Sequence, residues 1–83
     1  KNIKLATKNT DISRVLIIGA GCAGEMVVKE LEKNPQLNKK AVAIIDDDIT
    51  RIGDQVSGVD IVGTRNSILK IVKLYKIDEI IFL

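Results

Sequence analysis

Three glycines near the start of the chain have the spacing of a turn that binds phosphate groups. Residues 19–24 read GAGCAG, a GxGxxG pattern, and they follow the apolar run at 15–18. In such a turn the first glycine allows a tight bend, the second lets a phosphate approach the backbone, and the third lets the following helix pack closely on the sheet. Free backbone N–H groups, with about half an elementary charge at the start of the helix, attract a pyrophosphate. A nucleotide is therefore the leading candidate ligand.

An acidic residue follows at the distance expected for ribose recognition. Asp46 ends a second apolar run at 41–45, about 20 residues beyond the glycine turn. A carboxylate there accepts hydrogen bonds from ribose hydroxyl groups and repels a 2′-phosphate, which favours NAD over NADP, although Arg51 nearby would weaken the repulsion. The predicted cofactor is NAD, and the predicted cofactor-binding residues are Gly19, Gly21, Cys22, Ala23, Gly24 and Asp46.

Each of these features also has an interpretation without a ligand. The glycines can serve only the strand-to-helix turn, and the acidic run at 46–48 can be a solvated turn. Divalent-metal binding by this acidic run is a weak alternative, because adjacent carboxylates point in different directions, and we predict no metal site. Cys22 near the start of the helix, where the helix dipole favours a thiolate, makes a redox sensor a further hypothesis. The simpler interpretation is a small residue tolerated within the glycine motif.

The sequence contains no arrangement of a catalytic acid, base or nucleophile. It has no histidine. Tyr75 is followed four residues later by Glu79, not by the lysine of a Tyr-x-x-x-Lys pair, and it falls on an apolar helical face. We therefore predict no catalytic residue and no turnover of substrate by these residues alone.

Composition narrows the class of protein. The chain has 83 residues, of which 46% are hydrophobic and mostly aliphatic, which suits one small domain with an aliphatic core. The net charge is +2 and the charges are interspersed, so we expect no nucleic-acid partner. No apolar stretch approaches the roughly 20 residues of a membrane span, and a single cysteine fits a reducing compartment. We expect a cytoplasmic segment without membrane contact.

Periodicity predicts the elements that position the glycine turn. Strands are expected at 15–18, 41–45, 61–62 and 79–83, and helices at 25–33 and 64–76. Asn34 and Pro35 end the first helix, Thr64 can cap the second, and residues 49–60 form an irregular or hairpin-like excursion. With right-handed crossovers, the prediction is a Rossmann-like three-layer α/β sandwich. Its parallel sheet has about four strands in the order 3-2-1-4, with one helix on each face.

The ends of the chain suggest a part of a larger protein. Residues 1–13 lack clear periodicity and are predicted to be a linker, and residues 14–83 form the nucleotide-binding domain. The chain stops within the apolar run at 80–83, so we expect a fragment. Because one helix per face covers a sheet only thinly, we also expect a homodimer or docking on other parts of the parent protein.

Six short segments of the chain, taken in order, resemble those of a known domain. They read RVLIIGAG at 14–21, AG at 23–24, IIDDD at 44–48, GV at 58–59, GT at 63–64 and DEII at 78–81. From residue 14 to 83 the chain is similar to the amino-terminal Rossmann-like domain of membrane-anchored nucleoside-diphosphate-sugar epimerases and 4,6-dehydratases of bacterial polysaccharide biosynthesis, including capsule formation. A similar domain occurs in some sugar-phosphate transferases.

The resemblance implies an NAD-dependent parent enzyme on the cytosolic face of the membrane. In that family, transmembrane helices precede the domain, and a catalytic domain with its own cofactor site follows it. Three hypotheses then remain for the domain itself. It binds a nucleotide, it is a regulatory or assembly domain that keeps the fold without a cofactor, or it senses redox state through Cys22.

Overall fold

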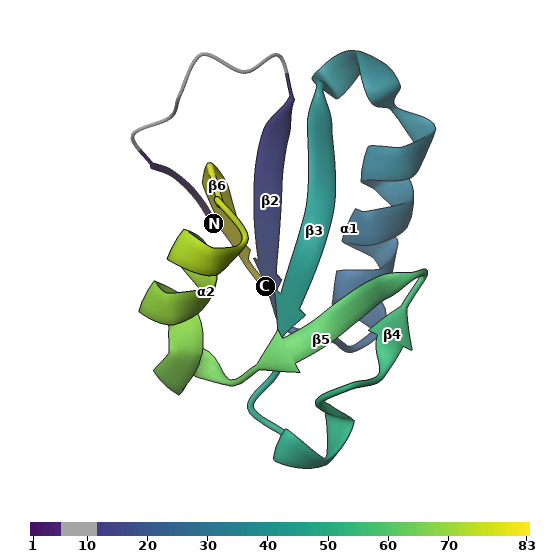
Figure 1. Cartoon of the computed structure of the whole chain (residues 1–83). Helices are drawn as coiled ribbons and strands as arrows, with labels where there is room; N and C mark the ends of the chain where they lie inside the picture. Colours follow the sequence, from purple (N-terminus) through teal and green to yellow (C-terminus); the bar gives the residue numbers. More distant parts are fainter. Residues whose placement is uncertain (6–11) are drawn as a thin grey trace.

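Four parallel strands form the centre of the structure, a computed structural model that describes residues 1–5 and 12–83 (Figure 1). They lie in the order β6-β2-β3-β5. Their bounds are β2 Ser13–Ile18, β3 Lys39–Ile45, β5 Val59–Gly63 and β6 Glu79–Phe82. Counted along the chain, this arrangement confirms the predicted order 3-2-1-4 of the parallel strands. The order follows because the chain moves from β2 to β3 to β5 in one direction along the sheet and then crosses back past β3 and β2 to β6.

Two short antiparallel strands extend the sheet at its edges, so the predicted parallel sheet of about four strands is the centre of a larger mixed sheet. β1 (Asn2–Lys4) pairs with β6, and β4 (Gln55–Val56) pairs with β5, which makes a six-stranded mixed sheet. β1 has only three residues and is exposed along its length. It is held by backbone pairing to an edge that would otherwise be open.

The segment expected to be a linker therefore contributes to the sheet. Residues 1–13 include β1 and the first residue of β2, while residues 6–11 of that segment lie outside the described residues. The excursion at 49–60 is irregular and hairpin-like, as predicted. It contains a 3-10 turn at Ile49–Arg51 and the β4–β5 hairpin, whose turn residues Ser57 and Gly58 both have positive φ, as type I′ turns require.

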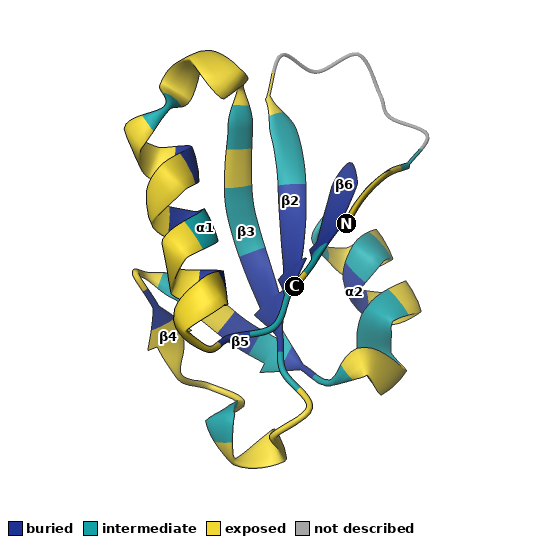
Figure 2. Cartoon of the chain, turned by 180° about the vertical axis from the view of Figure 1, so that it is seen from behind, coloured by how far each residue is buried: buried dark blue, intermediate teal, exposed yellow. Residues whose placement is uncertain are grey.

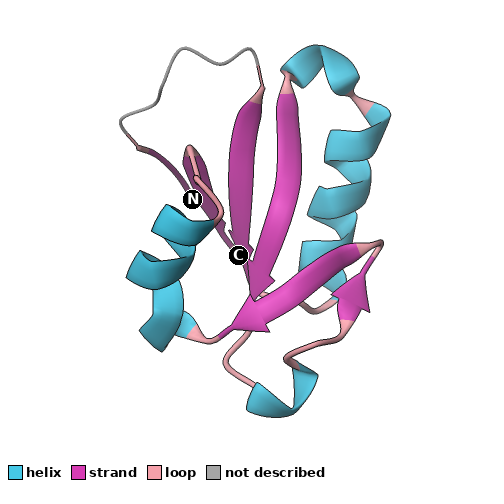
Figure 3. Cartoon of the chain, in the orientation of Figure 1, coloured by secondary structure: helices cyan, strands magenta, loops and turns pink. Residues whose placement is uncertain are grey.

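One helix covers each face of the sheet, as predicted (Figures 1 and 3). α1 (Cys22–Lys33) ends where Asn34 and Pro35 were expected to stop it. α2 (Ile68–Leu74) is shorter than predicted, because Arg65–Ser67 form a 3-10 turn before it. Thr64 precedes this turn without a side-chain capping hydrogen bond. Asn and Ser compete with the helix for backbone hydrogen bonds, which explains the late start.

Buried aliphatic side chains form one cluster on each side of the sheet. Successive residues of β2 alternate between them: Val15 and Ile17 face α1, and Leu16 faces α2. Both faces are buried (Figure 2), which is typical of parallel strands. Tyr75 packs against the α2-side cluster, as its place on an apolar helical face predicted.

A charged network lies at the amino edge of the parallel strands. Glu79, only 1% exposed, accepts hydrogen bonds at Oε2 from Lys39 Nζ (3.0 Å) and Asn2 Nδ2 (2.9 Å). Its other oxygen, Oε1, has no hydrogen-bond partner among the described residues. Asp78 accepts a hydrogen bond from the backbone N–H of Arg14 (2.9 Å). These carboxylates tie β1, β2 and β3 to β6.

Candidate nucleotide-binding site

The glycine turn lies at the carboxyl edge of the parallel strands, between β2 and α1. Gly19 has φ +120°, a conformation that side chains disfavour, and its N–H donates to the carbonyl of Ile45 (2.8 Å). A methyl group added at Gly24 would stand 2.2 Å from the carbonyl oxygen of Gly19. The first and third glycines therefore have the steric roles that their spacing predicted, a tight bend and close helix packing.

Gly21 is different, because no contact among the described residues requires a glycine there. Its backbone (φ −69°, ψ −158°) suits any residue, and a methyl group added to it would meet no atom within 4 Å. Among the described residues, no acceptor engages the N–H groups of Gly21, Cys22, Ala23 or Gly24. The first turn of α1 thus presents free donors beneath open space, which is the geometry that a phosphate group needs.

Asp46 turns its carboxylate toward the glycine turn. Oδ2 accepts a hydrogen bond from the N–H of Ala20 (3.1 Å), and Oδ1 accepts one from the N–H of Asp48 (2.8 Å). Arg51 Nη1 lies 3.6 Å from Oδ2 and offsets part of the charge, as its sequence position suggested. Each carboxylate oxygen can accept two hydrogen bonds. Asp46 therefore holds the shape of the turn and keeps capacity for a ribose hydroxyl.

A pocket of about 240 Å³ opens beside the turn, at the carboxyl ends of β2, β3 and β6. It is lined by Ile18, Gly19, Ile45, Asp46, Asp47, Arg65 and Leu83. The strand order reverses between β2 and β6, and open α/β sheets bind ligands in the crevice at such a switch point. Sequence reasoning missed Arg65. Its signal was its place just after Gly63, where a neighbouring parallel strand ends at the same edge.

Asp48 supports the loop that carries Arg51. It accepts hydrogen bonds at Oδ1 from the hydroxyl (2.6 Å) and the N–H (3.0 Å) of Thr50. These two bonds, with a smaller contribution from the Arg51 charge, hold the pKa of the Asp48 carboxyl below its ordinary 3.8.

Removing the Thr50 hydroxyl should raise that pKa. In Thr50→Val we expect the Asp48 carboxyl to titrate closer to 3.8, measured by NMR, because the largest stabilising contact of the charged form is lost. Since the folded-state pKa is lowered, the associated stability is present above the ordinary pKa and is lost as pH falls through the folded-state value. Identical titration curves in the two proteins would contradict this assignment.

The remaining features of the sequence concern Cys22, metal ligands and membrane spans. Cys22 is exposed at the first position of α1, and its redox role stays a prediction. Within residues 1–5 and 12–83, no three His, Cys, Asp or Glu side chains gather as metal ligands would. In the same described residues, no helix is long and apolar enough to cross a bilayer.

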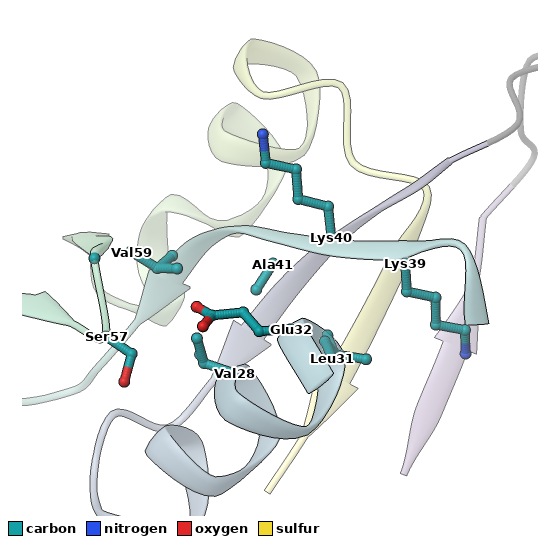
Figure 4. Close-up of a pocket in the computed structure, with 9 residues that line it drawn as sticks. Val28, Leu31, Glu32, Lys39, Lys40, Ala41, Ser57 and Val59 are labelled. Atoms are coloured by element: carbon teal, nitrogen blue, oxygen red, sulfur yellow. The ribbon is translucent and has the colours of Figure 1, made fainter. Parts of the chain in front are cut away.

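A second groove, of about 280 Å³, lies at the opposite edge of the sheet (Figure 4). The second half of α1, the start of β3 and the β4–β5 hairpin enclose it, and Val28, Leu31, Ala41 and Val59 contribute apolar side chains. Figure 4 shows Lys39 and Lys40 pointing in opposite directions, and Lys39 is engaged by Glu79. The groove lacks the free amides of the glycine turn, so the carboxyl edge is the better candidate site.

Comparison with known proteins agrees with this geometry. Residues 2–83 match the sequence profile of a family described as a CoA-binding domain. The chain belongs to this family. The polysaccharide biosynthesis protein EpsC of Bacillus subtilis (strain 168) is 36% identical to this CoA-binding-type domain over 80 residues, which is 96% of the chain. The domain spans only 13% of the length of EpsC.

Two solved structures share the fold of this CoA-binding-type domain. UDP-D-quinovosamine 4-dehydrogenase from Vibrio fischeri has a TM-score of 0.69 and 27% identity, and the match covers 80% of this chain and 52% of that one. RSP, a Rex-family repressor, has a TM-score of 0.71 and 19% identity, over 82% of this chain and 32% of that one. The second likeness shows the fold alone. The domain is Rossmann-like and related to a polysaccharide biosynthesis protein.

Proposed function

We propose that this domain binds a nucleotide through its glycine turn, with NAD as the leading cofactor. The observation that carries the proposal is Gly21. Within the part of the chain that the structure describes, it has no packing or backbone reason to be glycine, and it lies among free amides beneath open space. The family description supports a ligand of the same kind, because coenzyme A and NAD both contain an adenosine diphosphate unit. That shared unit is what the turn and Asp46 would hold.

The alternative is a regulatory or assembly domain that keeps the fold without a cofactor. One observation favours it. Asp46, the predicted ribose-binding residue, is already engaged by Ala20, Asp48 and Arg51. In this alternative the Asp46 carboxylate only stabilises the turn, through its hydrogen bond with Ala20.

Titration calorimetry separates the two functions. We expect NAD, NADP, coenzyme A or a UDP-sugar to bind saturably to the wild-type domain. In Gly21→Val the side chain would fill the space above the amides, so the bound nucleotide should lose at least about tenfold in affinity, since about 1.4 kcal/mol corresponds to that factor.

A matched control is Gln36→Val, an exposed position in the 3-10 turn Pro35–Leu37 at the far end of α1. It should bind as the wild type does. Unchanged affinity in Gly21→Val would overturn the phosphate site and favour the assembly domain, as would the absence of binding by every nucleotide.

We further propose that the parent protein is a nucleoside-diphosphate-sugar epimerase or 4,6-dehydratase of polysaccharide biosynthesis, with this domain at the cytosolic face of the membrane. The EpsC relative supports the pathway, and the dehydrogenase with the same fold supports the sugar-nucleotide chemistry. A sugar-phosphate transferase is the other candidate parent. Exposed apolar side chains on both helices, Met26, Leu69 and Leu74, support association as a homodimer or with the rest of the parent.

A further inference from the structure

Arg65 and Asp47 form a bidentate ion pair at the pocket beside the glycine turn. Arg65 Nε donates to Asp47 Oδ1 at 3.0 Å, and Arg65 Nη2 lies 2.9 Å from Asp47 Oδ2. Two parallel bonds of this kind hold the guanidinium and the carboxylate close to one plane. They use only the edge of the guanidinium, and the Arg65 side chain is 67% exposed. Its flat faces are therefore available to a ligand.

A flat surface is otherwise scarce in this protein. The sequence has two aromatic residues, Tyr75 and Phe82, and neither is among the described residues that line the pocket. Proteins bind nucleobases by stacking them on aromatic rings or on arginine guanidinium groups. Arg65 lines the same pocket as Gly19 and Asp46. A base on Arg65 would thus be joined through its ribose, near Asp46, to phosphates on the glycine turn.

We propose that the Arg65–Asp47 pair is the platform on which the base of the bound nucleotide stacks. This inference rests on the proposed nucleotide site. Arg51 is less suited to the role, because its guanidinium lies against the turn, 3.6 Å from Asp46 and 3.5 Å from the carbonyl of Ala20. Since every base has a flat face, stacking adds affinity with little choice of base. Arg65 should therefore increase the affinity for both adenine and uracil nucleotides.

The test compares a nucleotide with a ligand that has phosphates and no base. We expect Arg65→Lys, which keeps the charge and loses the plane, to weaken ADP and UDP by about tenfold, within the range for one stacked base. Binding of inorganic pyrophosphate should change less than about twofold. Exposed ion pairs contribute about 0–1 kcal/mol to stability, so the variant should stay folded. Lys70→Ala, at an exposed position of α2, controls for a surface substitution outside the pocket and should bind ADP as the wild type does.

The possible outcomes separate the two proposals. Equal weakening of ADP and pyrophosphate by Arg65→Lys would make Arg65 a charge contact and overturn the stacking platform. ADP binding that is sensitive to Gly21→Val and indifferent to Arg65→Lys would overturn the platform alone. ADP binding that is indifferent to Gly21→Val would overturn the proposed function and, with it, this inference. Asp47→Asn should also weaken ADP binding, by less than Arg65→Lys does. The substitution removes one of the two carboxylate oxygens that hold the guanidinium in place.

Discussion

Replacing Lys39 by methionine is expected to lower the free energy of unfolding by about 3 kcal/mol. Lys39 Nζ lies 3.0 Å from Oε2 of Glu79, a carboxylate that is 1% exposed. Without the lysine, Glu79 stays buried with Asn2 as its remaining hydrogen-bond donor among the described residues. We expect the lower end of the range for a broken buried pair, because the Lys39 side chain is itself 24% exposed. Chemical unfolding in urea would measure the loss.

The double variant Lys39→Met with Glu79→Leu is the informative control. It removes both charges, and apolar replacement of a whole buried pair is often neutral or stabilising. Oε1 of Glu79 lacks a partner among the described residues, so its burial is not fully offset even in the wild type. We therefore expect the double variant to regain most of the lost stability. Wild-type stability in the single Lys39→Met variant would show that Glu79 does not depend on its ion pair.

The central strands and the glycine turn could be predicted from the sequence because local rules determine them. Apolar runs mark the buried strands, Asn34 and Pro35 end α1, and the handedness of crossovers gives the order of the parallel strands. The two edge strands obey no such rule. β1 is exposed along its length and pairs mainly through its backbone, and the side-chain contact that Asn2 adds is to Glu79, far away in the sequence.

Side-chain partners of the site were harder to predict than its elements. Asp46 was placed correctly at the end of β3, but the direction of its carboxylate, toward Ala20, depends on how the loop after β3 folds back. Arg65 is 18 positions from Asp47, and the two meet only because parallel strands end at one edge. The contact between Asn2 and Glu79 could not be predicted for the same reason, because the two residues are 77 positions apart and no local pattern links them.

Gly24→Ala is expected to destabilise the domain by about 3 kcal/mol or more, the upper range for overpacking. The added methyl group would lie 2.2 Å from the carbonyl oxygen and 3.1 Å from the carbonyl carbon of Gly19. Both atoms are backbone, and the Gly19 N–H is bonded to Ile45 at 2.8 Å, so relief requires α1 to move off the sheet. That movement would loosen Val28 and Leu31, which α1 buries in the core. Thermal and urea unfolding would measure the effect.

Gly21→Ala is the matched control, with the same added atom three residues earlier. Its methyl group would meet nothing within 4 Å, and alanine in place of glycine at a helix N-cap costs less than about 1 kcal/mol. Because alanine elsewhere in a helix is about 1 kcal/mol more favourable than glycine, a loss in Gly24→Ala can come only from the clash. Two variants of equal stability would contradict the close packing of α1 on the turn. Unequal stability, with nucleotide affinity reduced in the well-folded Gly21→Ala protein, would divide the motif into one glycine that the fold requires and one that the ligand requires.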